Sequence, residues 1–453
     1  MSHYKPYPVY KDSGVEWLGT VPEHWAVHRM KSLIDSAQNG IWGEDPDGGV
    51  DDIACARVAD FDRNDFTVKG ELPTSRKVPE AQRLSRQVNY GDLLIEKSGG
   101  GEQTTVGVVV QYQGEQPVIC SNFVAVVKPK NGVKPRWLCY TNAYLYSVSV
   151  NTRSIKQTTG IQNIDSDQYF SERVAVPSEA EQHAIAAHLD SETASIDALV
   201  EKKARFIELL HEKRQALITH AVTKGLDPKA KMKDSGVEWL GEVPAHWEQA
   251  PLKHLISSIG QGWSPECEAR KPERGEWGVV KVGCVNGGVF RPQESKALPA
   301  AMEPRPELGL RKGDVLVSRA NTRELVGSCA VIPQDYPHLL LCDKLYRIGC
   351  GARVTPEFLA ALITVYGRRA VEIEANGASS SMVNIAQSVI LDLLVAVPSN
   401  EEQKSIMDRV VVETMRIKTM LVKTERSIAL LKERRSALIT AAVTGQIDLR
   451  QAV

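Results

Sequence analysis

The phrase KDSGVEWLGTVPEHW occupies positions 11–25, and KDSGVEWLGEVPAHW occupies positions 233–247. The copies begin 222 residues apart, and further pairs of segments keep this offset within one residue. The pairs are GDLLI (91–95) with GDVLV (313–317), AVPSEAEQ (175–182) with AVPSNEEQ (396–403), and RQALITHAVTKGLD (214–227) with RSALITAAVTGQID (435–448). The chain is therefore an internal duplication of a unit of roughly 220 residues.

The composition is that of an ordinary globular protein. Of 453 residues, 42% are hydrophobic and 25% are charged, and the net charge is −1. A surface that binds a polyanion must therefore be a local patch. No stretch is apolar enough for a membrane span or a signal peptide, so we expect a cytoplasmic protein without membrane contact. Eight scattered cysteines without a C-x-x-C spacing indicate neither a metal site nor a disulfide framework.

Each copy has two unlike parts. The first part carries short runs of branched apolar residues separated by Gly, Pro, Asn and Asp, together with helical stretches such as the one that begins at Pro356. This pattern predicts a mixed α/β globular domain. The second part starts with an S-x-x-E capping box, Ser178 with Glu181 or Ser399 with Glu402, and continues without Pro or Gly to Thr223 or Thr444. This pattern predicts one helix of about 45 residues, about 67 Å long at 1.5 Å per residue.

An apolar stripe follows each predicted helix at alternating three- and four-residue spacings. On the first helix the stripe consists of Ile185, Leu189, Ile196, Leu199, Phe206, Leu210 and Leu217. On the second helix the corresponding positions include Ile406, Val410, Ile417, Met420, Leu431 and Leu438. A helix this long needs a partner for its stripe, although packing against its own domain is the simpler alternative.

The short connection between the first helix and the second domain favours an antiparallel pair of helices. The expected fold class is therefore α+β, with two mixed α/β domains joined by two long antiparallel helices that form a coiled coil, and with internal pseudo-twofold symmetry. The predicted domain limits are 1–175, 176–226, 227–396 and 397–448.

The order of these phrases, repeated twice over nearly the whole chain, resembles the specificity subunits of type I DNA restriction-modification systems. The resemblance implies a DNA reader without catalytic chemistry. Each globular half would be a target recognition domain for half of a bipartite, asymmetric site, and the helices would set the gap. It also implies that the chain docks two modification subunits, which are adenine methyltransferases, and through them two restriction subunits. Double-stranded DNA is the expected ligand. S-adenosylmethionine, ATP and Mg²⁺ are expected in the partner subunits, and no cofactor is expected in this chain.

Missing motifs agree with a chain that is not an enzyme. No Pro-Pro pair is present for an adenine methyltransferase [ND]-P-P-[FY] tetrapeptide, and no G-x-x-x-x-G-K-[ST] is present for a nucleotide. The alternative from another functional class is a coiled-coil scaffold or adaptor whose globular ends bind proteins. The near-neutral charge favours this alternative, and the family phrases count against it.

Candidate DNA-binding residues lie in two kinds of polar segment. One leaves a strand after GDLLI or GDVLV, and the other precedes each long helix. The candidates are Lys97, Ser98, Arg153, Lys156, Arg319, Asn321, Arg323, Ser380 and Asn384. Arg pairs with guanine and Asn with adenine, whereas Ser and Lys more often hold phosphates. For each residue a solvated turn or a cap is the competing interpretation.

The repeated tryptophans are interpreted mainly as packing residues. Trp42 and Trp263 each lie near a Gly in both copies, and a base-facing role is the alternative for them. The doubled phrase contributes Trp25 and Trp247, which we expect to pack each domain against the helices. Specificity should then lie in the segments that the duplication did not preserve, about 35–90 and 257–312.

Overall fold

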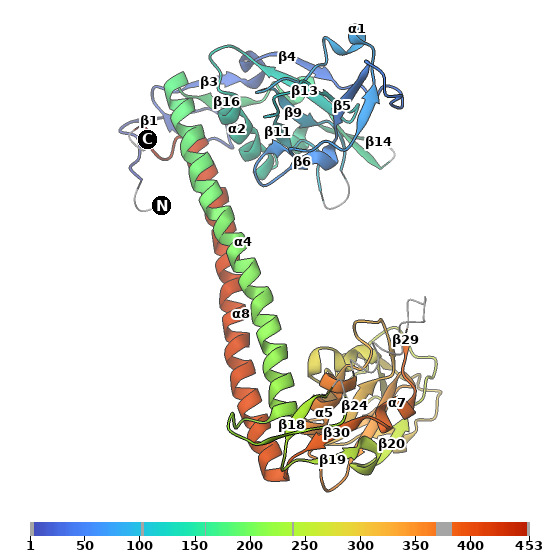
Figure 1. The fold of residues 1–453 in the computed structure, drawn as a ribbon. Helices are drawn as coiled ribbons and strands as arrows, with labels where there is room; N and C mark the ends of the chain where they lie inside the picture. The colour runs from blue at the N-terminus through green and yellow to red at the C-terminus, as the bar shows by residue number, and fades with distance from the viewer. Residues whose placement is uncertain (1–3, 101–103, 159, 238–239, 368–382, 451–453) are drawn as a thin grey trace. The chain divides into compact units, whose positions relative to one another are not determined.

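The computed structural model describes residues 4–100, 104–158, 160–237, 240–367 and 383–450. The chain divides into two compact units, residues 1–205 with 424–453, and residues 206–423. Each unit holds one globular domain and part of both long helices, α4 (Glu179–Lys224) and α8 (Asn400–Val443) (Figure 1). The predicted fold class, two mixed α/β domains joined by long helices, is confirmed. The predicted domain limits treat the helices as separate spacers, and they stay a prediction.

The two globular domains share a four-stranded core with the same strand order. In the first unit the order is β4-β13-β9-β11, and in the second it is β20-β28-β24-β26. The strands are β4 (Ile34–Asn39), β9 (Leu93–Glu96), β11 (Val109–Gln111) and β13 (Val124–Pro129), matched by β20 (Ile256–Gln261), β24 (Val315–Ser318), β26 (Cys329–Val331) and β28 (Leu345–Cys350). Neighbouring strands in both cores are antiparallel. The repeated GDLLI and GDVLV segments lead into the matching strands β9 and β24.

The domains differ in what surrounds this core. In the first unit β7 (Thr67–Val68) and β6 (Phe61–Asp62) extend the core sheet, and a second sheet has the order β12-β5-β8. In the second unit the additional sheet has the order β22-β21-β27-β23. Their strands are β5 (Asp52–Ala56), β8 (Ser75–Lys77), β12 (Ile119–Cys120), β21 (Gly278–Val280), β22 (Ser295–Ala297), β23 (Gly309–Leu310) and β27 (Tyr336–Leu340). Most of these strands come from the segments in which the two copies diverge.

Short helices and small sheets complete each domain. Two-stranded sheets join β1 (Tyr10–Asp12) to β2 (Thr20–Pro22), β17 (Met232–Asp234) to β18 (Glu242–Pro244), β3 (Ala26–Arg29) to β16 (Arg173–Val176), and β19 (Glu248–Pro251) to β30 (Leu394–Val397). The described short α-helices are α1 (Glu80–Arg83), α2 (Pro135–Ser147), α3 (Ser166–Tyr169), α5 (Pro356–Leu362) and α7 (Gln387–Leu391). The predicted helix at Pro356 is confirmed, although the side chain of Thr355 makes no capping hydrogen bond.

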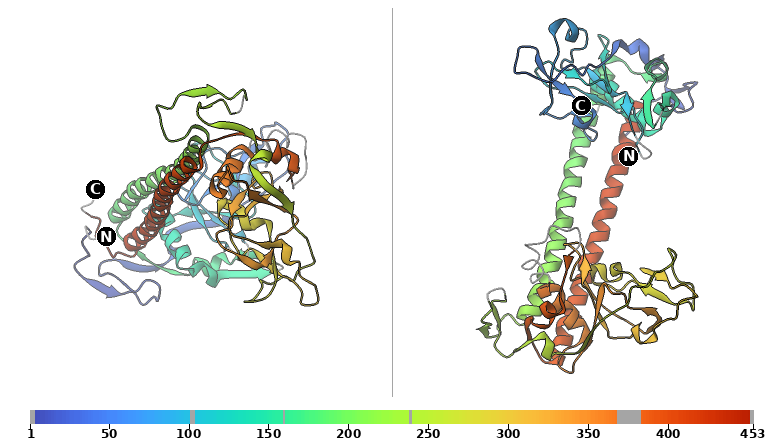
Figure 2. Two further views of the ribbon diagram at one scale, coloured as in Figure 1. Left: turned by 90° about the horizontal axis from the view of Figure 1, so that it is seen from below. Right: turned by 90° about the vertical axis from the view of Figure 1, so that its right-hand side faces the viewer.

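Within each unit the start of one long helix lies beside the end of the other. In the first unit Leu189 of α4 and Leu438 of α8 belong to one buried cluster, and in the second unit Val222 of α4 and Ile406 of α8 do so. The two helices therefore run antiparallel where they meet in each unit, and Figures 1 and 2 show them side by side there.

The apolar seam between the helices differs in part from the predicted stripe. Ile185, Leu189, Ile196 and Leu210 are buried on α4, as predicted. Leu199 and Phe206 are each 43% exposed, and Met420 on α8 is 38% exposed, so the prediction is wrong at these three positions. The next residues along the chain, Val200, Ile207 and Leu421, are more buried and take the inward positions. Between Ile196 and Leu210 the more buried positions on α4 are 200 and 207, whereas the predicted positions are 199 and 206. The four-residue step therefore comes before the three-residue step, which reverses the predicted order.

Trp25 and Trp247 of the doubled phrase join each domain to both helices. Both side chains are almost fully buried. In the first unit Gly445, just beyond α8, lies against Pro22 and Trp25, and its φ of +73° favours glycine. In the second unit Gly225, just beyond α4, lies against Trp247 in the same way. The expectation that this phrase packs each domain against the helices is confirmed in both units.

A glutamate in the first turn of each long helix binds the same phrase. The Glu181 carboxylate accepts hydrogen bonds from Ser178 Oγ at 2.7 Å and from Trp25 Nε1 at 3.3 Å, and its Oε1 lies 2.8 Å from His24 Nε2. The Glu402 carboxylate is bound by Trp247 Nε1 at 3.1 Å and lies 2.9 Å from His246 Nε2. The predicted capping box is present at Ser178 and Glu181, which bind each other's backbone N–H groups. At Ser399 and Glu402 the described structure forms one of the two bonds of the box, from the Glu402 backbone N–H to Ser399 Oγ at 3.3 Å. Both glutamates also fasten the globular domain to its helix.

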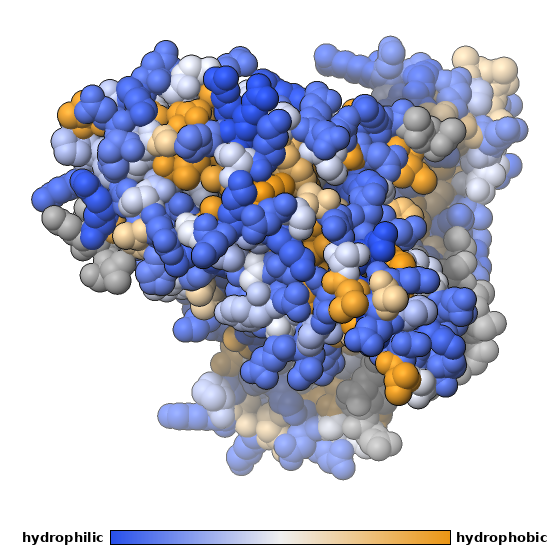
Figure 3. Space-filling model, turned by 90° about the horizontal axis from the view of Figure 1, so that it is seen from above, coloured by the Kyte–Doolittle hydropathy of each residue, from blue (hydrophilic) through white to orange (hydrophobic). Residues whose placement is uncertain are grey.

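Hydrophilic residues predominate on the face that Figure 3 shows, and hydrophobic residues form small, separated groups there. Among the residues that the structure describes, no helix is long and apolar enough to cross a membrane. All eight cysteines are free.

We expect Trp25→Ala to destabilise the first unit by about 3–5 kcal/mol, because it removes a large buried side chain and leaves a cavity between domain and helices. Hydrogen exchange of the amides in β3 and β16 measures this loss. Val50→Ala, at a residue that is 93% exposed, is the control and should change stability by less than about 0.5 kcal/mol. Unchanged protection in W25A would contradict the role of Trp25 as the joint.

The Glu181 carboxylate predicts a specific acid sensitivity. Burial raises the pKa of Glu181, but the hydrogen bonds from His24, Ser178 and Trp25 outweigh burial, so its pKa lies below the usual 4.5. A lowered pKa contributes stability above the unfolded-state value, and this contribution is lost as the pH falls through the folded-state value. We expect Glu181→Gln to be less stable at neutral pH and to lose less stability below about pH 4.5, measured as denaturation midpoints against pH. Glu71→Gln, at an exposed carboxyl group, should keep the wild-type profile, and an identical acid profile in E181Q would refute the argument.

Candidate nucleic-acid interface

The two kinds of polar segment that hold the candidate residues pair with each other in both units. In the first unit β10 (Ser98–Gly99) pairs with β15 (Ile161–Ile164), which pairs with β14 (Ile155–Thr158). In the second unit β25 (Ala320–Asn321) pairs with β29 (Val383–Asn384). Each pairing joins the exit of the core strand to the segment that precedes the long helix. Segments that are about 60 residues apart in sequence therefore form one surface per unit.

In the first unit Ser98 and Lys156 lie opposite the same residue, Asn163. The Ser98 hydroxyl donates to Asn163 Oδ1 at 2.5 Å. Lys156 is exposed and forms an ion pair with Asp165 at 2.7 Å, which raises the pKa of Lys156 and lowers that of Asp165. Lys97 is partly exposed next to Ser98. Ser98 and Lys156 thus lie on the two strands that flank β15, Lys97 directly precedes β10, and all three residues are at least partly accessible.

Arg153 lies apart from them, against the doubled phrase. Its guanidinium group stacks on Trp17 at 4.4 Å from the ring centroid and donates to Glu16 at 3.3 Å. These contacts support a structural role, in which Arg153 holds the start of β14 against the doubled phrase. A phosphate contact by Arg153 stays a prediction.

In the second unit the candidates differ in accessibility. The Asn321 side chain is 9% exposed, receives the backbone N–H of Thr322 at 2.9 Å and donates to Ser318 Oγ at 3.3 Å. These bonds hold the turn, and pairing with adenine would require them to break. Arg323 and Asn384 are exposed, and Ser380 lies outside the described residues.

Arg319 retains a donor without a described partner. Its Nη1 donates to the backbone oxygen of Asp343 at 3.2 Å, and its guanidinium group lies 5.6 Å from the centroid of the Tyr346 ring. The Nε atom is buried and has no hydrogen-bond partner among the described residues. A buried N–H group without a partner is costly, so this position suits an incoming acceptor.

A pocket of about 480 Å³ opens beside β10 in the first unit. It is lined by Trp42, Arg57, Val58, Ala59, Glu96, Ser98, Gly99, Gly100, Ser121, Asn122 and Phe123. Sequence reasoning identified Ser98 and considered Trp42, but it missed Glu96 and Phe123. The available signal was a single acidic residue, Glu96, at the end of an apolar strand, followed at once by a lysine.

An Arg–Trp stack recurs at a similar place in both domains. Arg76 lies over Trp42 at 4.5 Å from the ring centroid, and Arg305 lies over Trp263 at 4.5 Å. Both pairs lie in the divergent segments, so the sequence comparison does not align the arginines. A stacked guanidinium group can hold an aromatic ring in place and still present donors to an anion.

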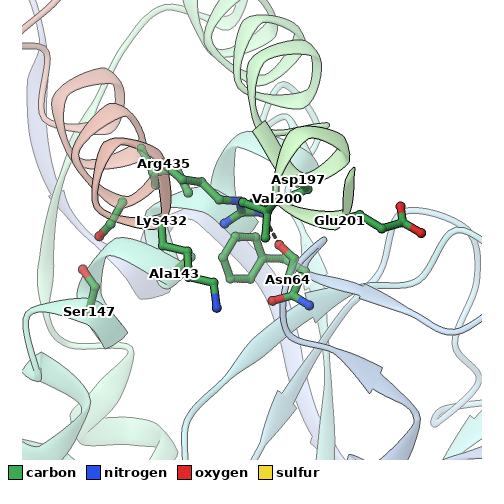
Figure 4. Close-up of a pocket in the computed structure, with 11 residues that line it drawn as sticks. Asn64, Ala143, Ser147, Asp197, Val200, Glu201, Lys432 and Arg435 are labelled. Carbon is green, nitrogen blue, oxygen red and sulfur yellow. Dashed lines mark hydrogen bonds and ion pairs between the residues drawn. The ribbon is translucent and has the colours of Figure 1, made fainter. Parts of the chain in front are cut away.

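A second pocket, also of about 480 Å³, lies between the first globular domain and the helices (Figure 4). Arg435 extends from α8 toward Asp197 on α4, to whose carboxylate it donates at 3.0 Å, and toward Asn64, whose backbone oxygen it also binds. Its guanidinium group lies 5.3 Å from the centroid of the Phe66 ring. Because Arg435 is already bound to three elements of the fold, we interpret this pocket as part of the domain–helix joint.

No family model matches the chain. Several curated proteins are similar to it in sequence. The chain is 26% identical over 216 residues to the type I restriction enzyme EcoEI specificity subunit of Escherichia coli, a match that covers 46% of this chain and 36% of that protein. It is 23% identical over 342 residues to the EcoKI specificity subunit of Escherichia coli strain K12, covering 74% and 69%. It is 23% identical over 401 residues to the MjaVIII specificity subunit of Methanocaldococcus jannaschii, covering 86% of each chain.

Solved structures with low sequence identity share the fold. One is a chain in a structure determined to study complex assembly and conformational transition of the type I R-M system, with a TM-score of 0.70, 14% identity and coverage of 93% of this chain and 98% of that chain. Another is the HsdS subunit from Thermoanaerobacter tengcongensis, with a TM-score of 0.56, 14% identity and coverage of 94% and 98%. The comparisons therefore confirm the resemblance to the specificity subunits of type I restriction enzymes, and the chain has the fold of that family.

Proposed function

We propose that the chain is the DNA sequence-specificity subunit of a type I restriction-modification complex. Each globular domain would read one half of a bipartite, asymmetric DNA site, and the chain itself would catalyse no reaction. One observation carries the proposal: two domains with the same four-stranded core carry different additional sheets on a pair of long helices. A duplicated framework with unlike additions suits two unlike half-sites read by one chain. The specificity subunits to which the chain is similar in sequence support the same assignment.

The long helices would fix the gap between the half-sites. α4 is one continuous helix of 46 residues and α8 is one of 44 residues, and each contributes to both units. A helix rises about 1.5 Å per residue, so its length sets a spacing that does not depend on base contacts. The bases read by each domain would be decided separately, by the surfaces near β10 and β25.

The helices would also dock two modification subunits, which are adenine methyltransferases. Support comes from apolar side chains that the seam leaves exposed at duplicated positions. Leu199 and Met420 correspond under the repeat and are 43% and 38% exposed, and Leu209 and Leu430 correspond and are 45% and 47% exposed. Exposed apolar residues that recur on a helix face are typical of protein interfaces. Two equivalent stripes suit two copies of one partner.

The remaining parts of the proposal concern the partners. S-adenosylmethionine would be bound by the modification subunits, and ATP and Mg²⁺ by two restriction subunits that join through them. The complex would act on double-stranded DNA in the cytoplasm. The target adenine must leave the base stack to be methylated, and this chain would position the modification subunit over it.

The first test is a methylome. We expect cells that express the chain with the adenine methyltransferase encoded beside it to methylate adenines in a bipartite, asymmetric motif with a fixed gap. Exchanging the segment 257–312 for that of another specificity subunit should change one half-site only. A continuous or palindromic motif, or the absence of a neighbouring gene with N-P-P-[FY], would contradict the proposal and favour a scaffold that binds proteins.

The gap has a separate test. We expect four residues inserted beside Ala194 on α4, with four beside Arg434 on α8, to lengthen the gap by about two base pairs. The insertion adds about 6 Å of helix, and one base-pair step is about 3.4 Å. Both helices are changed because Arg434 and Glu192 form an ion pair across them. Four residues inserted after the exposed Gly48 should leave the gap as it is. An unchanged gap in the helix variant would refute the proposal that the length of the helices sets the gap.

A further inference from the structure

The pocket beside β10 combines three chemical features. Its lining includes a carboxylate, two aromatic rings and several small polar groups. The Glu96 residue is only 3% exposed, whereas Trp42 is 39% exposed and Phe123 is 45% exposed. Burying a carboxylate is costly, so its place in a partly open pocket requires a reason.

The geometry of Glu96 leaves acceptor capacity on the pocket side. Arg63 Nη2 donates to its Oε2 at 2.9 Å. Its Oε1 lies toward Gly99, 3.7 Å from where a Cβ on that residue would stand, and Gly99 has a φ of +134° that favours glycine. A carboxylate offers about four acceptor positions, so one arginine does not exhaust it. Burial raises the pKa of Glu96, while Arg63 and the Val108 amide oppose that rise.

The two aromatic rings of the pocket, those of Trp42 and Phe123, restrict which ligand suits this carboxylate. Arg76 covers the Trp42 ring at 4.5 Å from its centroid and holds it, and Phe123 stands on the turn before β13. Exposed aromatic rings stack well on flat π systems. A flat ring that also donates a hydrogen bond to a buried carboxylate describes an unstacked nucleobase, because each of the four bases carries a donor on its Watson–Crick edge.

We propose that this pocket takes one unstacked base of the first half-site, and that Glu96 accepts a hydrogen bond from the Watson–Crick edge of that base. This inference rests on the proposed function, because it names how the first domain reads part of its DNA. An exocyclic amino group of adenine, cytosine or guanine, or the ring N–H of guanine or thymine, would supply this hydrogen bond. The base would lie beside Trp42 and Phe123, and Ser98 and Asn122, which also line the pocket, would hold its backbone.

The second domain does not repeat this pocket chemistry. The offset of 222 residues places Ser318 at the position of Glu96, and Ser318 is fully buried and bound to Asn321. The repeated strand therefore ends in a carboxylate in one domain and in a hydroxyl group in the other. The proposed base pocket belongs to the first half-site only, and variants of Glu96 should leave the reading of the second half-site unchanged.

The decisive variant is Glu96→Gln in the complex with the modification subunit. Arg63 is a donor, so the amide oxygen of E96Q would face Arg63 and the amide N–H₂ would face the donor of the base, where no hydrogen bond can form. We expect E96Q to bind the wild-type site about tenfold or more weakly than the wild-type complex does. Glu115→Gln, an equal change at an exposed carboxyl group of the same domain, should leave binding as in the wild type.

Two further measurements decide the matter if E96Q does not fold. Phe123→Ala removes an exposed ring and should weaken binding to the wild-type site by about fivefold or more, the contribution of stacking on one base. Mismatches are made at each position of the first half-site in turn, by changing only the base on one strand. At one position the mismatch should strengthen binding, because the unchanged base then leaves the stack at lower cost, and that position identifies the base that the pocket takes. If mismatches weaken binding or have no effect at every position, the base is read while stacked and the inference is wrong.

The outcome separates this inference from the proposed function. If the wild-type complex methylates no bipartite motif, the proposed function fails. If it does, but E96Q or F123A binds the wild-type site as tightly as the wild type does, only the pocket assignment fails.

Discussion

The structure depends on one carboxylate in the first turn of each long helix. Glu181 and Glu402 each bind the tryptophan and the histidine of the doubled phrase, and Glu181 also accepts the Ser178 backbone N–H of its capping box. The glutamine that follows each of them is buried and accepts a backbone N–H at the start of a domain helix, from Lys134 in one unit and from Thr355 in the other. All of these bonds except the exposed one between His246 and Glu402 are buried or partly buried, so the direction in which each helix leaves its domain is closely determined.

This anchor explains why the most similar segments of the two copies are not the candidate reading surfaces. The doubled phrase and the AVPS segments that lead into the long helices, 175–178 and 396–399, must match each other, and they have the same partners in both units. The strand order of the four-stranded core is likewise the same. The additional sheets have no shared partner and are free to differ. A chain built this way can change what one domain reads without changing how the domain is held, which is what two independent half-sites require.

Much of the framework could be predicted because its signals are local in sequence. The capping boxes at Ser178 and Ser399 and the absence of Pro and Gly afterward predicted both long helices close to their observed bounds. The seam was harder, because choosing between Leu199 and Val200 depends on small rotations that only a packed partner decides. For Asn321 the residue type suggested a base contact, whereas its amide is bound within its own turn. The role of Arg435 was not visible either, since its partners come from distant parts of the chain.

The sequence by itself determined the duplication, the two long helices, the segments that anchor them and the segments that are free to vary. Periodicity, capping and repetition need only neighbouring residues or a comparison of the chain with itself. Only the tertiary structure decided which polar side chains gather at one place. Glu96 is a buried acceptor because Arg63 and Phe123 approach it from other strands and turns. Ser98 and Lys156 lie on either side of Asn163 because β15 pairs with strands on both of its edges, one of them about 60 residues earlier in the sequence. Contacts between distant segments set burial, and burial sets the chemistry of a carboxylate.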